Sequence, residues 1–444
     1  MDAVLYRADR VVTMTPDHPE ADAFVVADGR VRDVGDAAEL RSRWAGRVRG
    51  EELRGVVTPG LIDAHMHMQR AGLKALDYLQ PDDDVDRFIV AMRESFDDDG
   101  PEHPPFADRI RALERVQPLL HALGITSVVD PAVTPDELRG YQAARRRGLL
   151  TMRTVAMPYL ELTNGDDTEI DDTIARLAGI GVATGFGDDM LSLGGIKVYL
   201  DGEALKGQAW LEDPWDASGY TGLRRIPEAE YRRLVAWCAS QGWGVGTHAV
   251  GSAAVALAVD AAATAGTPVA DLRFQIIHGY LETPAGAMAR AAGAGVIASL
   301  QPSIIWHNGA GLRAALGDRA ERANPVRSWL DHGATVAFGS DGPFFVFDPR
   351  HLMWQAVTRR IEGDERPLDA AEAITLAEAF AAYTTGAARA AYAEADRGVI
   401  APGACADWVL WPADPTTVAI DDVRTLPILR TEVAGRTVYR KDPA

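Results

Sequence analysis

Two histidines separated by one residue follow an apolar run near the start of the chain, in "GLIDAHMHM" over residues 60–68. If the run is a strand, side chains two positions apart lie on the same face, so His65 and His67 point the same way. Two imidazoles on one face can supply half of a tetrahedral metal shell. The pair alone does not distinguish a metal site from two surface histidines on an edge strand.

Polar groups also end several later strand-like runs. These groups are Lys197 in "GGIKVYLDG", His248 in "VGTHAVG", His278 in "QIIHGYLE" and Asp341 in "AFGSDGP". Each of them has an ordinary structural explanation when it is taken alone. Four histidines and an aspartate at the ends of such runs, in a chain with only ten histidines, favour one shared metal site.

The elements that must position these groups are predicted from the alternation of apolar runs and helical segments. Eight strand-like runs lie between residues 55 and 343, and helical segments such as 228–242 and 251–266 separate them. This order predicts an α/β fold with a (β/α)8 TIM barrel, in which catalytic residues come from the carboxyl ends of the strands. A further group of helices is expected over roughly residues 350 to 393.

Both ends of the chain are rich in strand-forming residues and carry hairpin turns, at Asp28-Gly29 and Ala434-Gly435. Neither end is long enough to bury a core alone. We therefore predict one small β-sandwich built from residues 1–56 and 400–444, and a barrel domain over 57–399. The acidic, proline-bounded stretch 81–105 is expected to be an insertion after the first barrel strand.

The composition excludes several classes of protein. The net charge is −19 and no basic cluster occurs, which argues against a nucleic-acid partner; the arginines at 145–147 end a predicted helix, where cations are favoured. Cys238 and Cys405 are far apart, which fits a reducing compartment. We see no signal peptide and no membrane-spanning run. We expect a cytoplasmic protein that acts on a small molecule away from any membrane; whether it forms a homo-oligomer stays open.

Four segments together resemble the amidohydrolase superfamily, in the YtcJ-like amidohydrolase-3 branch that includes N-substituted formamide deformylases. They are "VVTPGLIDAHMH", "FGSDGP", "AAYTTGAARAAY" and "RGVIAPGACADWVLWPADP". The first two are similar to the family's first-strand and eighth-strand signatures. The last two match its closing helix and its return to the small β domain, so the resemblance covers nearly the whole chain.

The resemblance implies a binuclear metal centre, most simply of zinc, with manganese, iron or nickel as alternatives. The buried ion would be held by His65, His67 and Asp341, and the more exposed ion by His248 and His278. Lys197, carboxylated by carbon dioxide, would bridge both ions. A metal-bridging hydroxide would then attack an amide-like carbonyl of a formamide, N-acyl compound or cyclic amide, while Asp341 passes the proton to the leaving nitrogen.

The sequence also departs from the family pattern, and this keeps alternatives open. Gly251-Ser252 stands where the family has Gly-Asp, and the loop after Lys197 carries Glu203 and Lys206, which we expect to face the substrate. A mononuclear deaminase of the superfamily would typically show His-x-x-Glu and no lysine on strand four. A lyase or isomerase is compatible with the same ligands, whereas a metal-free scaffold should have lost some of them.

Substrate contacts are expected from residues that follow the barrel strands, because barrel loops carry such contacts. The candidates are Tyr159 after the third strand, Trp306 and His307 after the seventh, and Phe344 after Asp341. A loop aromatic packed on a neighbouring helix is the structural alternative for Trp306 and His307.

Overall fold

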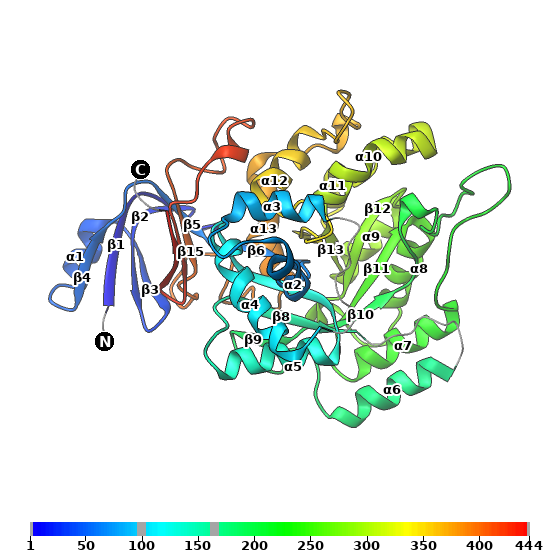
Figure 1. Ribbon diagram of the computed structural model, residues 1–444, viewed down its shortest axis with the longest axis horizontal. Coiled ribbons are helices and arrows are strands. Elements are labelled where there is room, and N and C mark those ends of the chain that lie inside the picture. Colours follow the sequence, from blue (N-terminus) through cyan, green and yellow to red (C-terminus); the bar gives the residue numbers. More distant parts are fainter. Residues whose placement is uncertain (1–2, 96–103, 160–167, 442–444) are drawn as a thin grey trace.

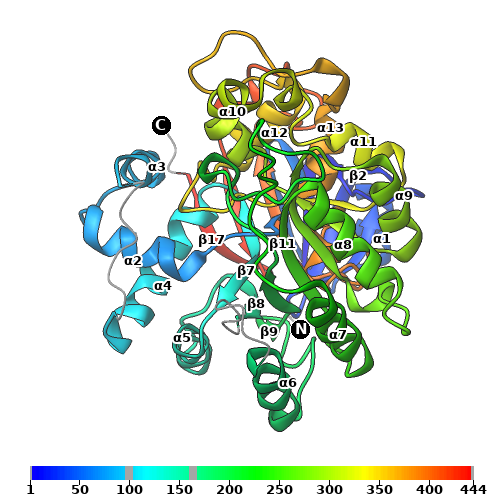
Figure 2. The same cartoon turned by 90° about the vertical axis from the view of Figure 1, so that its right-hand side faces the viewer.

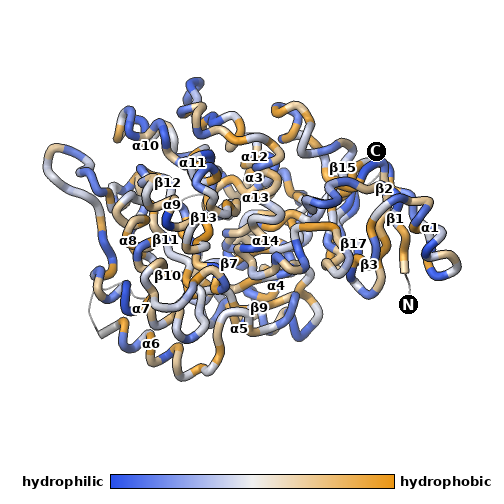
Figure 3. Tube along the Cα trace, turned by 180° about the vertical axis from the view of Figure 1, so that it is seen from behind, coloured by the Kyte–Doolittle hydropathy of each residue, from blue (hydrophilic) through white to orange (hydrophobic). Residues whose placement is uncertain are grey.

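The computed structural model describes residues 3–95, 104–159 and 168–441, with the main chain only at 168 and 169. A sheet that contains both chain ends lies beside a larger body in which helices surround parallel strands (Figures 1 and 2). Hydrophobic residues follow the strands of both parts, and hydrophilic residues gather in the outer loops (Figure 3). Among the described residues, no helix is long and apolar enough to cross a membrane.

The first part is one eight-stranded sheet in the order β17-β16-β15-β5-β1-β2-β3, with β4 also paired to β1. We predicted a β-sandwich here, but direct pairing of β5 with β15 joins the strands of both chain ends into a single sheet. Its strands are β1 (Ala3–Val12), β2 (Glu20–Ala27), β3 (Arg30–Gly35), β4 (Val48–Glu52), β5 (Val56–Pro59), β15 (Trp408–Trp411), β16 (Arg430–Val433) and β17 (Arg436–Arg440). The predicted turns at Asp28-Gly29 and Ala434-Gly435 join β2 to β3 and β16 to β17, with positive φ at all four residues.

The core of this sheet requires residues from both ends of the chain. The ring of Trp408, on β15, lies 5.2 Å from the ring of Tyr6 and 5.7 Å from that of Phe24. The opposite face packs on helix α1 (Ala37–Arg43) through Leu40. Since neither end supplies this aromatic cluster alone, the pairing of the two ends explains how such short segments form a core.

The larger body contains two parallel sheets. The first has four strands, β6 (Leu61–Asp63), β7 (Ile125–Val133), β8 (Arg153–Pro158) and β9 (Leu191–Leu193). The second has five, β10 (Ile196–Tyr199), β11 (Val245–Gly251), β12 (Gln275–Leu281), β13 (Ile297–Leu300) and β14 (Val336–Phe338). Single bridges connect the sheets at both margins, Tyr159 with Lys197 and Met66 with Gly342. The predicted alternation of parallel strands and helices is therefore confirmed, with the hydrogen-bonded ladders divided between two sheets.

Two runs that we predicted as single barrel strands are each divided at glycine. The run 55–67 splits at Gly60: β5 pairs with β1 and β15, and β6 pairs with β7. A Cβ at Gly60 would lie 2.2 Å from Thr126 Oγ1, so only glycine permits this crossing. The run 191–202 splits at Gly194-Gly195, where a Cβ on Gly195 would lie 2.7 Å from the carbonyl carbon of Gly244. The predicted domain boundaries at 56 and 400 stay a prediction, although β5 pairs with the terminal sheet.

Helices connect the parallel strands and follow the last of them. The α-helices are α2 (Met68–Tyr78), α3 (Val85–Glu94), α4 (Phe106–His121), α5 (Pro135–Arg146), α6 (Thr168–Ile180), α7 (Glu228–Ser240), α8 (Ser252–Ala263), α9 (Ala285–Ala294), α10 (Pro302–Leu316), α11 (Val326–Asp331), α12 (Pro349–Thr358), α13 (Leu376–Tyr383) and α14 (Thr385–Ala390). Helix α5 ends at the 145–147 arginines as predicted. The acidic stretch 81–105 contains α3, and its residues 96–103 lie outside the described part.

A buried ion pair joins the two parts of the fold. Arg153, on β8, donates through Nε to Asp407 Oδ2 at 2.5 Å and through Nη2 to Oδ1 at 3.1 Å, with 1% and 7% of the two side chains exposed. Replacing Arg153 by methionine leaves the Asp407 carboxylate buried and unpaired. We expect the free energy of unfolding, measured by urea denaturation, to fall by about 3–5 kcal/mol.

The matched control for that variant is Arg41→Met, because Arg41 pairs with Glu52 at the surface. Exposed pairs of this kind contribute no more than about 1 kcal/mol. Equal unfolding free energies for the two variants would show that the Arg153–Asp407 pair does not stabilise the contact between the terminal sheet and the parallel strands.

Candidate metal centre

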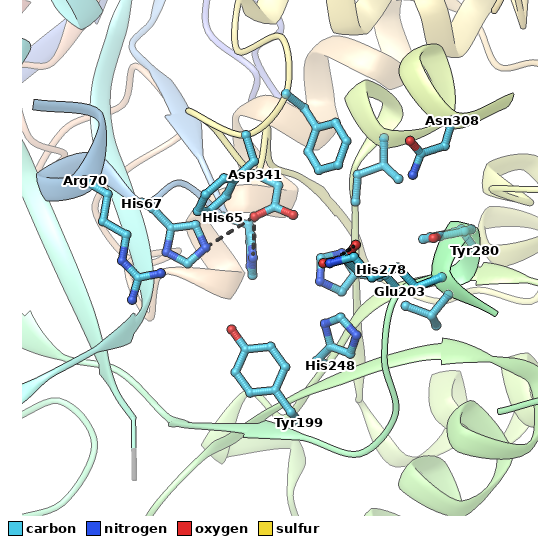
Figure 4. A pocket seen from close by; sticks show the side chains of 15 residues that line it. His65, His67, Arg70, Tyr199, Glu203, His248, His278, Tyr280, Asn308 and Asp341 are labelled. Atoms are coloured by element: carbon cyan, nitrogen blue, oxygen red, sulfur yellow. Dashed lines mark ion pairs between the residues drawn. The ribbon is translucent and has the colours of Figure 1, made fainter. Parts of the chain in front are cut away.

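The six predicted ligands come together at the carboxyl ends of the parallel strands. They are His65 and His67 between β6 and α2, Lys197 on β10, His248 on β11, His278 on β12 and Asp341 after β14. The four histidines and the aspartate line one cavity of ≈ 550 Å³ (Figure 4). Lys197 lies below the cavity surface, where it is 1% exposed. Both sheets therefore contribute to a single site.

Asp341 lies at the centre of the cluster. Its Oδ1 is 3.4 Å from His65 Nε2 and 3.3 Å from His67 Nε2. His65, His278 and Asp341 each place a ligand atom within 4.8 Å of the other two. The ring of His248 lies 4.5 Å from that of His278. This convergence on one carboxylate is the arrangement that a metal site requires.

The cluster keeps its imidazoles in the form that binds metal ions. Burial lowers the pKa of His65 to about 4, and it holds the pKa of His248 and of His278 well below the ordinary value. Although burial alone raises the pKa of Asp341, its contacts with His65 and His67 bring that pKa well below its usual range. Neutral imidazole nitrogens and an ionised carboxylate are the ligand states that divalent metals need.

Lys197 is a buried amine without a polar partner. Among the described residues, its Nζ has no hydrogen bond, and the ring of Tyr199 lies 4.8 Å away. Burial lowers the pKa of Lys197 to about 7, against the opposing effect of the Asp341 charge. Asp201, the acid that could have paired with it, instead accepts backbone N–H groups from Trp210, Val250 and Gly251. The ordinary structural explanation for a buried lysine, an ion pair with a nearby acid such as Asp201, is therefore not seen among the described residues.

Unpaired buried nitrogens indicate that these residues fit a metal ion. Within the described part of the chain, Nδ1 of His65, Nδ1 of His67 and both nitrogens of His248 are buried without hydrogen-bond partners. Buried polar atoms of this kind are rare because each costs free energy unless something binds it. Imidazole nitrogens beside a carboxylate suit zinc and its neighbours among the divalent metals.

Two of the predicted ligands have a backbone conformation that is uncommon outside glycine. The φ angle is 81° at His278 and 55° at Asp341. A non-glycine residue in the left-handed region costs on the order of 1–3 kcal/mol and is found mostly at functional sites. The fold therefore holds both side chains at the cavity against their local backbone preference.

Two positioning residues were not predicted from the sequence. Asp63 accepts the backbone N–H of His65 at 3.1 Å and that of Ser340 at 3.0 Å. It therefore connects the ligand-carrying segments that follow β6 and β14. Gln301 accepts from His278 Nδ1 at 2.8 Å, and its own Nε2 donates to Ser299 O at 3.1 Å. This arrangement leaves His278 Nε2 unprotonated and available to a metal. Gln301 ends the seventh strand-like run, which is the signal that could have identified it.

Replacing Gln301 by leucine should weaken metal binding. The His278 ring loses the acceptor that fixes its tautomer and orientation, and such losses typically cost about 10- to 100-fold in affinity. Competition with a chromogenic zinc chelator measures the change, and Gln241→Leu, at an exposed position on the outer surface, is the matched control. Unchanged zinc affinity in Gln301→Leu would show that another group orients His278.

Of the four predicted substrate contacts, Phe344 lines the cavity and the other three do not. Trp306 packs instead on His351 and Trp354 of α12, at ring distances of 4.8 and 5.5 Å. His307 Nδ1 lies 3.4 Å from Glu362 Oε2, and the ring of Tyr159 stacks edge-on against Tyr199 at 5.5 Å.

The remaining cavity wall combines apolar and polar groups. The residues that were not predicted to line it are Arg70, Tyr199, Val250, Tyr280, Ile304 and Asn308. Phe345, the neighbour of Phe344, lines it as well. Glu203 and Lys206 line the rim, as expected for the loop after Lys197, and they pair with each other at 3.1 Å. Apolar walls with a few polar groups are typical of small-molecule sites.

Fold and site together define an α/β protein with a metal-binding cluster at the carboxyl ends of its parallel strands. A model of the amidohydrolase family matches residues 91–439, and the chain belongs to this family. The predicted family is thereby confirmed. His65 and His67 lie before the matched residues, so their assignment depends on the geometry given above.

Three relatives with similar sequences come from two bacteria and a plant. The chain is 27% identical over 350 residues to N-substituted formamide deformylase of Arthrobacter pascens. The aligned region covers 74% of this chain and 61% of the relative. It is 28% identical over 256 residues to LONG AFTER FAR-RED 3 of Arabidopsis thaliana (56% and 44% covered) and to YtcJ of Bacillus subtilis strain 168 (56% and 48%). Each match spans less than two thirds of the relative.

Solved structures share the fold over nearly the whole chain. An uncharacterized metal-dependent hydrolase from Pyrococcus horikoshii OT3 superposes with a TM-score of 0.77 at 20% identity, covering 95% of this chain and 99% of the other. A triazine hydrolase from Arthrobacter aurescens superposes with a TM-score of 0.64 at 17% identity, covering 99% and 95%. At these identities the likeness is one of fold.

Proposed function

We propose that this protein is a binuclear metal-dependent hydrolase that cleaves an amide-like C–N bond of a small molecule, such as a formamide, an N-acyl compound or a cyclic amide. The observation that carries the proposal is one buried cluster, in which His65, His67 and His278 lie around Asp341 and His248 lies beside His278. Lys197 is buried at the same site, and its Nζ has no hydrogen bond to the described part of the chain. Membership of the amidohydrolase family supports the class of reaction. The relative named as a formamide deformylase supports the class of bond.

We also propose that the two parallel sheets act as one (β/α)8 barrel. Backbone hydrogen bonds cross one margin from Ala64 N to Phe338 O at 3.0 Å and from Asp341 N to His65 O at 2.7 Å. The other margin is crossed by the bridge between Tyr159 and Lys197. The candidate ligands from both sheets then lie together at the carboxyl end of the barrel, as in barrel enzymes.

In this proposal the metal ligands divide into two sets that share Lys197. One divalent ion, most simply zinc, would be held by His65, His67 and Asp341, and a second by His248 and His278, and carboxylated Lys197 would supply an oxygen ligand to both. Bound ions supply two kinds of chemistry here, since they make water a nucleophile at neutral pH and polarise a carbonyl group. The rest of the mechanism depends on the protein's own side chains.

Lys197 is suited to carboxylation because its amine is buried and has no competing hydrogen-bond partner in the part of the chain that the structure describes. The neutral amine attacks carbon dioxide, forms an N–C bond and releases one proton, which leaves a carbamate with a single negative charge. A pKa near 7 keeps a substantial neutral fraction available at neutral pH. The product exchanges a buried cation for an anionic oxygen ligand, which removes the cost of an uncompensated ammonium group.

Asp341 is the proposed proton carrier. Its carboxylate lies in the cavity wall between His65 and His67, and its low pKa keeps it ionised and able to accept a proton. It accepts the proton from the attacking water and delivers it to the leaving nitrogen. Phe344 and Phe345 line the same cavity and add apolar surface to it.

The deaminase alternative has less support from the site. The position that would carry its glutamate is Gly251, which has no side chain, and its backbone N–H is bound to Asp201. Asp201 accepts three backbone N–H groups and therefore serves to hold the β11–α8 turn. A lyase or isomerase differs from the proposed hydrolase in its products, and a metal-free scaffold differs in its metal content.

The experiment that tests the proposal is a substrate screen with the purified, zinc-replete enzyme. The panel contains formamides, N-acyl amino acids, lactams and carbamates, and both products are quantified. We expect at least one class to give the acid and amine (or, for a lactam, the ring-opened amino acid) in equal amounts, with activity lost on chelation and recovered with zinc. Ammonia released from an exocyclic amine would favour the deaminase, and isomeric products would favour a non-hydrolytic enzyme.

A further inference from the structure

Arg70 is a charged residue of the cavity wall that the proposed reaction does not use. It lies in the first turn of α2, three residues after His67, and lines the cavity together with the metal-ligand candidates. Figure 4 shows it beside His67, on the side of the cavity away from Tyr280 and Asn308. Its guanidinium group stays positively charged at neutral pH, and it lies beside the candidate metal ligands.

One edge of the guanidinium is anchored to the protein. Nε donates to Glu137 Oε1 at 3.2 Å, and Nη2 lies 3.4 Å from Ala132 O. Glu137 is itself fixed, since its other oxygen accepts from Thr134 N at 2.8 Å and from Thr134 Oγ1 at 2.9 Å. The inner edge of Arg70 is therefore held in one orientation by a buried capping box.

The outer edge of the guanidinium is open to the cavity. The Arg70 side chain is 36% exposed, and Nη1 donates no hydrogen bond to the part of the chain that the structure describes. Glu137 and nearby Asp130 offset its charge, so any ligand is recognised mainly by directed hydrogen bonds. A planar group fixed on one edge and open on the other is preorganised for a carboxylate.

The other charged groups of the cavity do not offer the same feature. Lys206, at the rim, is paired with Glu203 at 3.1 Å and is 64% exposed. Val250, Ile304 and Phe345 also line the cavity and belong to one hydrophobic cluster with Tyr280, which suits an apolar substituent. The cavity therefore combines an apolar wall, a metal cluster and one oriented guanidinium.

We propose that Arg70 binds a carboxylate of the substrate, so that the preferred substrates are anionic amides of the N-acyl or N-formyl amino-acid class and not neutral formamides. The inference rests on the proposed function for the reaction, but the binding preference can be measured separately. A carboxylate held by Arg70 places the amide of the same molecule over the neighbouring cluster of His65, His67 and Asp341, and its side chain toward the apolar wall.

The test uses two compounds that differ only in the carboxylate, N-formyl-phenylalanine and N-formyl-2-phenylethylamine. Turnover of both is measured with the zinc-loaded enzyme. Binding is measured by calorimetry. The wild-type enzyme is used for a compound that it does not hydrolyse, and Asp341→Asn is used for a compound that the wild type hydrolyses. We expect the carboxylate compound to be favoured roughly 10- to 100-fold, as for a charge-assisted hydrogen-bonded pair, and Arg70→Met to abolish this preference while the neutral compound changes little.

Two further variants distinguish a loss of carboxylate binding from misfolding of Arg70→Met. Arg70→Lys keeps a cation beside Glu137 and should retain only part of the preference, because it lacks the planar fork. Arg70→Met combined with Glu137→Gln removes both charges of the pair. The control is Arg290→Met, since Arg290 is paired with Asp260 on the outer helices, and it should leave the preference intact.

The outcomes separate the two proposals. Hydrolysis of both compounds with no dependence on Arg70 overturns the carboxylate site and leaves the proposed function standing. Arg70-dependent binding of the carboxylate compound without any hydrolysis supports the site and contradicts the proposed reaction. Arg70 variants that lower stability but keep the preference would assign Arg70 to a purely structural contact between α2 and α5.

Discussion

Lys197→Ala should lose most of the turnover and one of the two metal ions. The variant removes the group that we propose bridges both ions, and outer partners of metal ligands alone cost about 10- to 100-fold, so a loss on the order of 100-fold or more is expected. Elemental analysis should give about two ions per chain in the wild type and fewer in the variant. Acetate or propionate should restore part of both, because a small carboxylate fits the space left by the carbamate.

Two controls separate this explanation from simple loss of a lysine. Lys441→Ala removes an exposed lysine near the end of the described chain and should leave metal content and turnover unchanged. Lys197→Arg should not respond to acetate, since a fixed positive charge would occupy the bridging position. Full turnover and two ions in Lys197→Ala would exclude the binuclear carbamate site, and a mononuclear site of histidines and Asp341 would become the better account.

The ligand set could be predicted from the sequence because it depends on local patterns. Strand side chains alternate, and the parallel strands of an α/β fold end at one face, so polar groups at the ends of apolar runs must meet. The divisions at Gly60 and at Gly194-Gly195 could not be predicted in this way. They depend on close approaches to Thr126 and Gly244, which are distant in the sequence and become neighbours only in the fold.

The individual side chains that line the cavity could not all be predicted from local sequence patterns either. Ile304 and Asn308 are four residues apart on α10 and both line the cavity. Trp306 lies halfway between them, about 200° around a helix of 3.6 residues per turn, and so it faces α12. Trp306 and His307 were predicted as barrel-loop residues, and the helix that contains them was not predicted. Glu137 and Ala132, which accept hydrogen bonds from Arg70, are more than sixty residues away from it along the chain. No local sequence pattern predicts these contacts.

Asp341→Asn should abolish turnover by a different route from Lys197→Ala. Asparagine keeps the size of the side chain and one oxygen ligand, but it cannot accept a proton. Removal of a general base typically costs about 10²- to 10⁴-fold in rate, and the loss should appear in kcat more than in KM. Acetate should not rescue this variant, because the space beside the ligands stays filled by the amide.

The metal content of Asp341→Asn distinguishes a proton carrier from a ligand alone. If Asp341 carries the proton, supplying zinc until the wild-type content is reached should leave kcat at its low value. If Asp341 serves only as a ligand, restoring the zinc content should restore kcat as well. Asp331→Asn, an exposed aspartate at the end of α11, is the matched control and should behave as the wild type. The contacts of Asp341 Oδ1 with His65 and His67 favour a combined role, since they hold the ionised carboxylate beside the metal ligands.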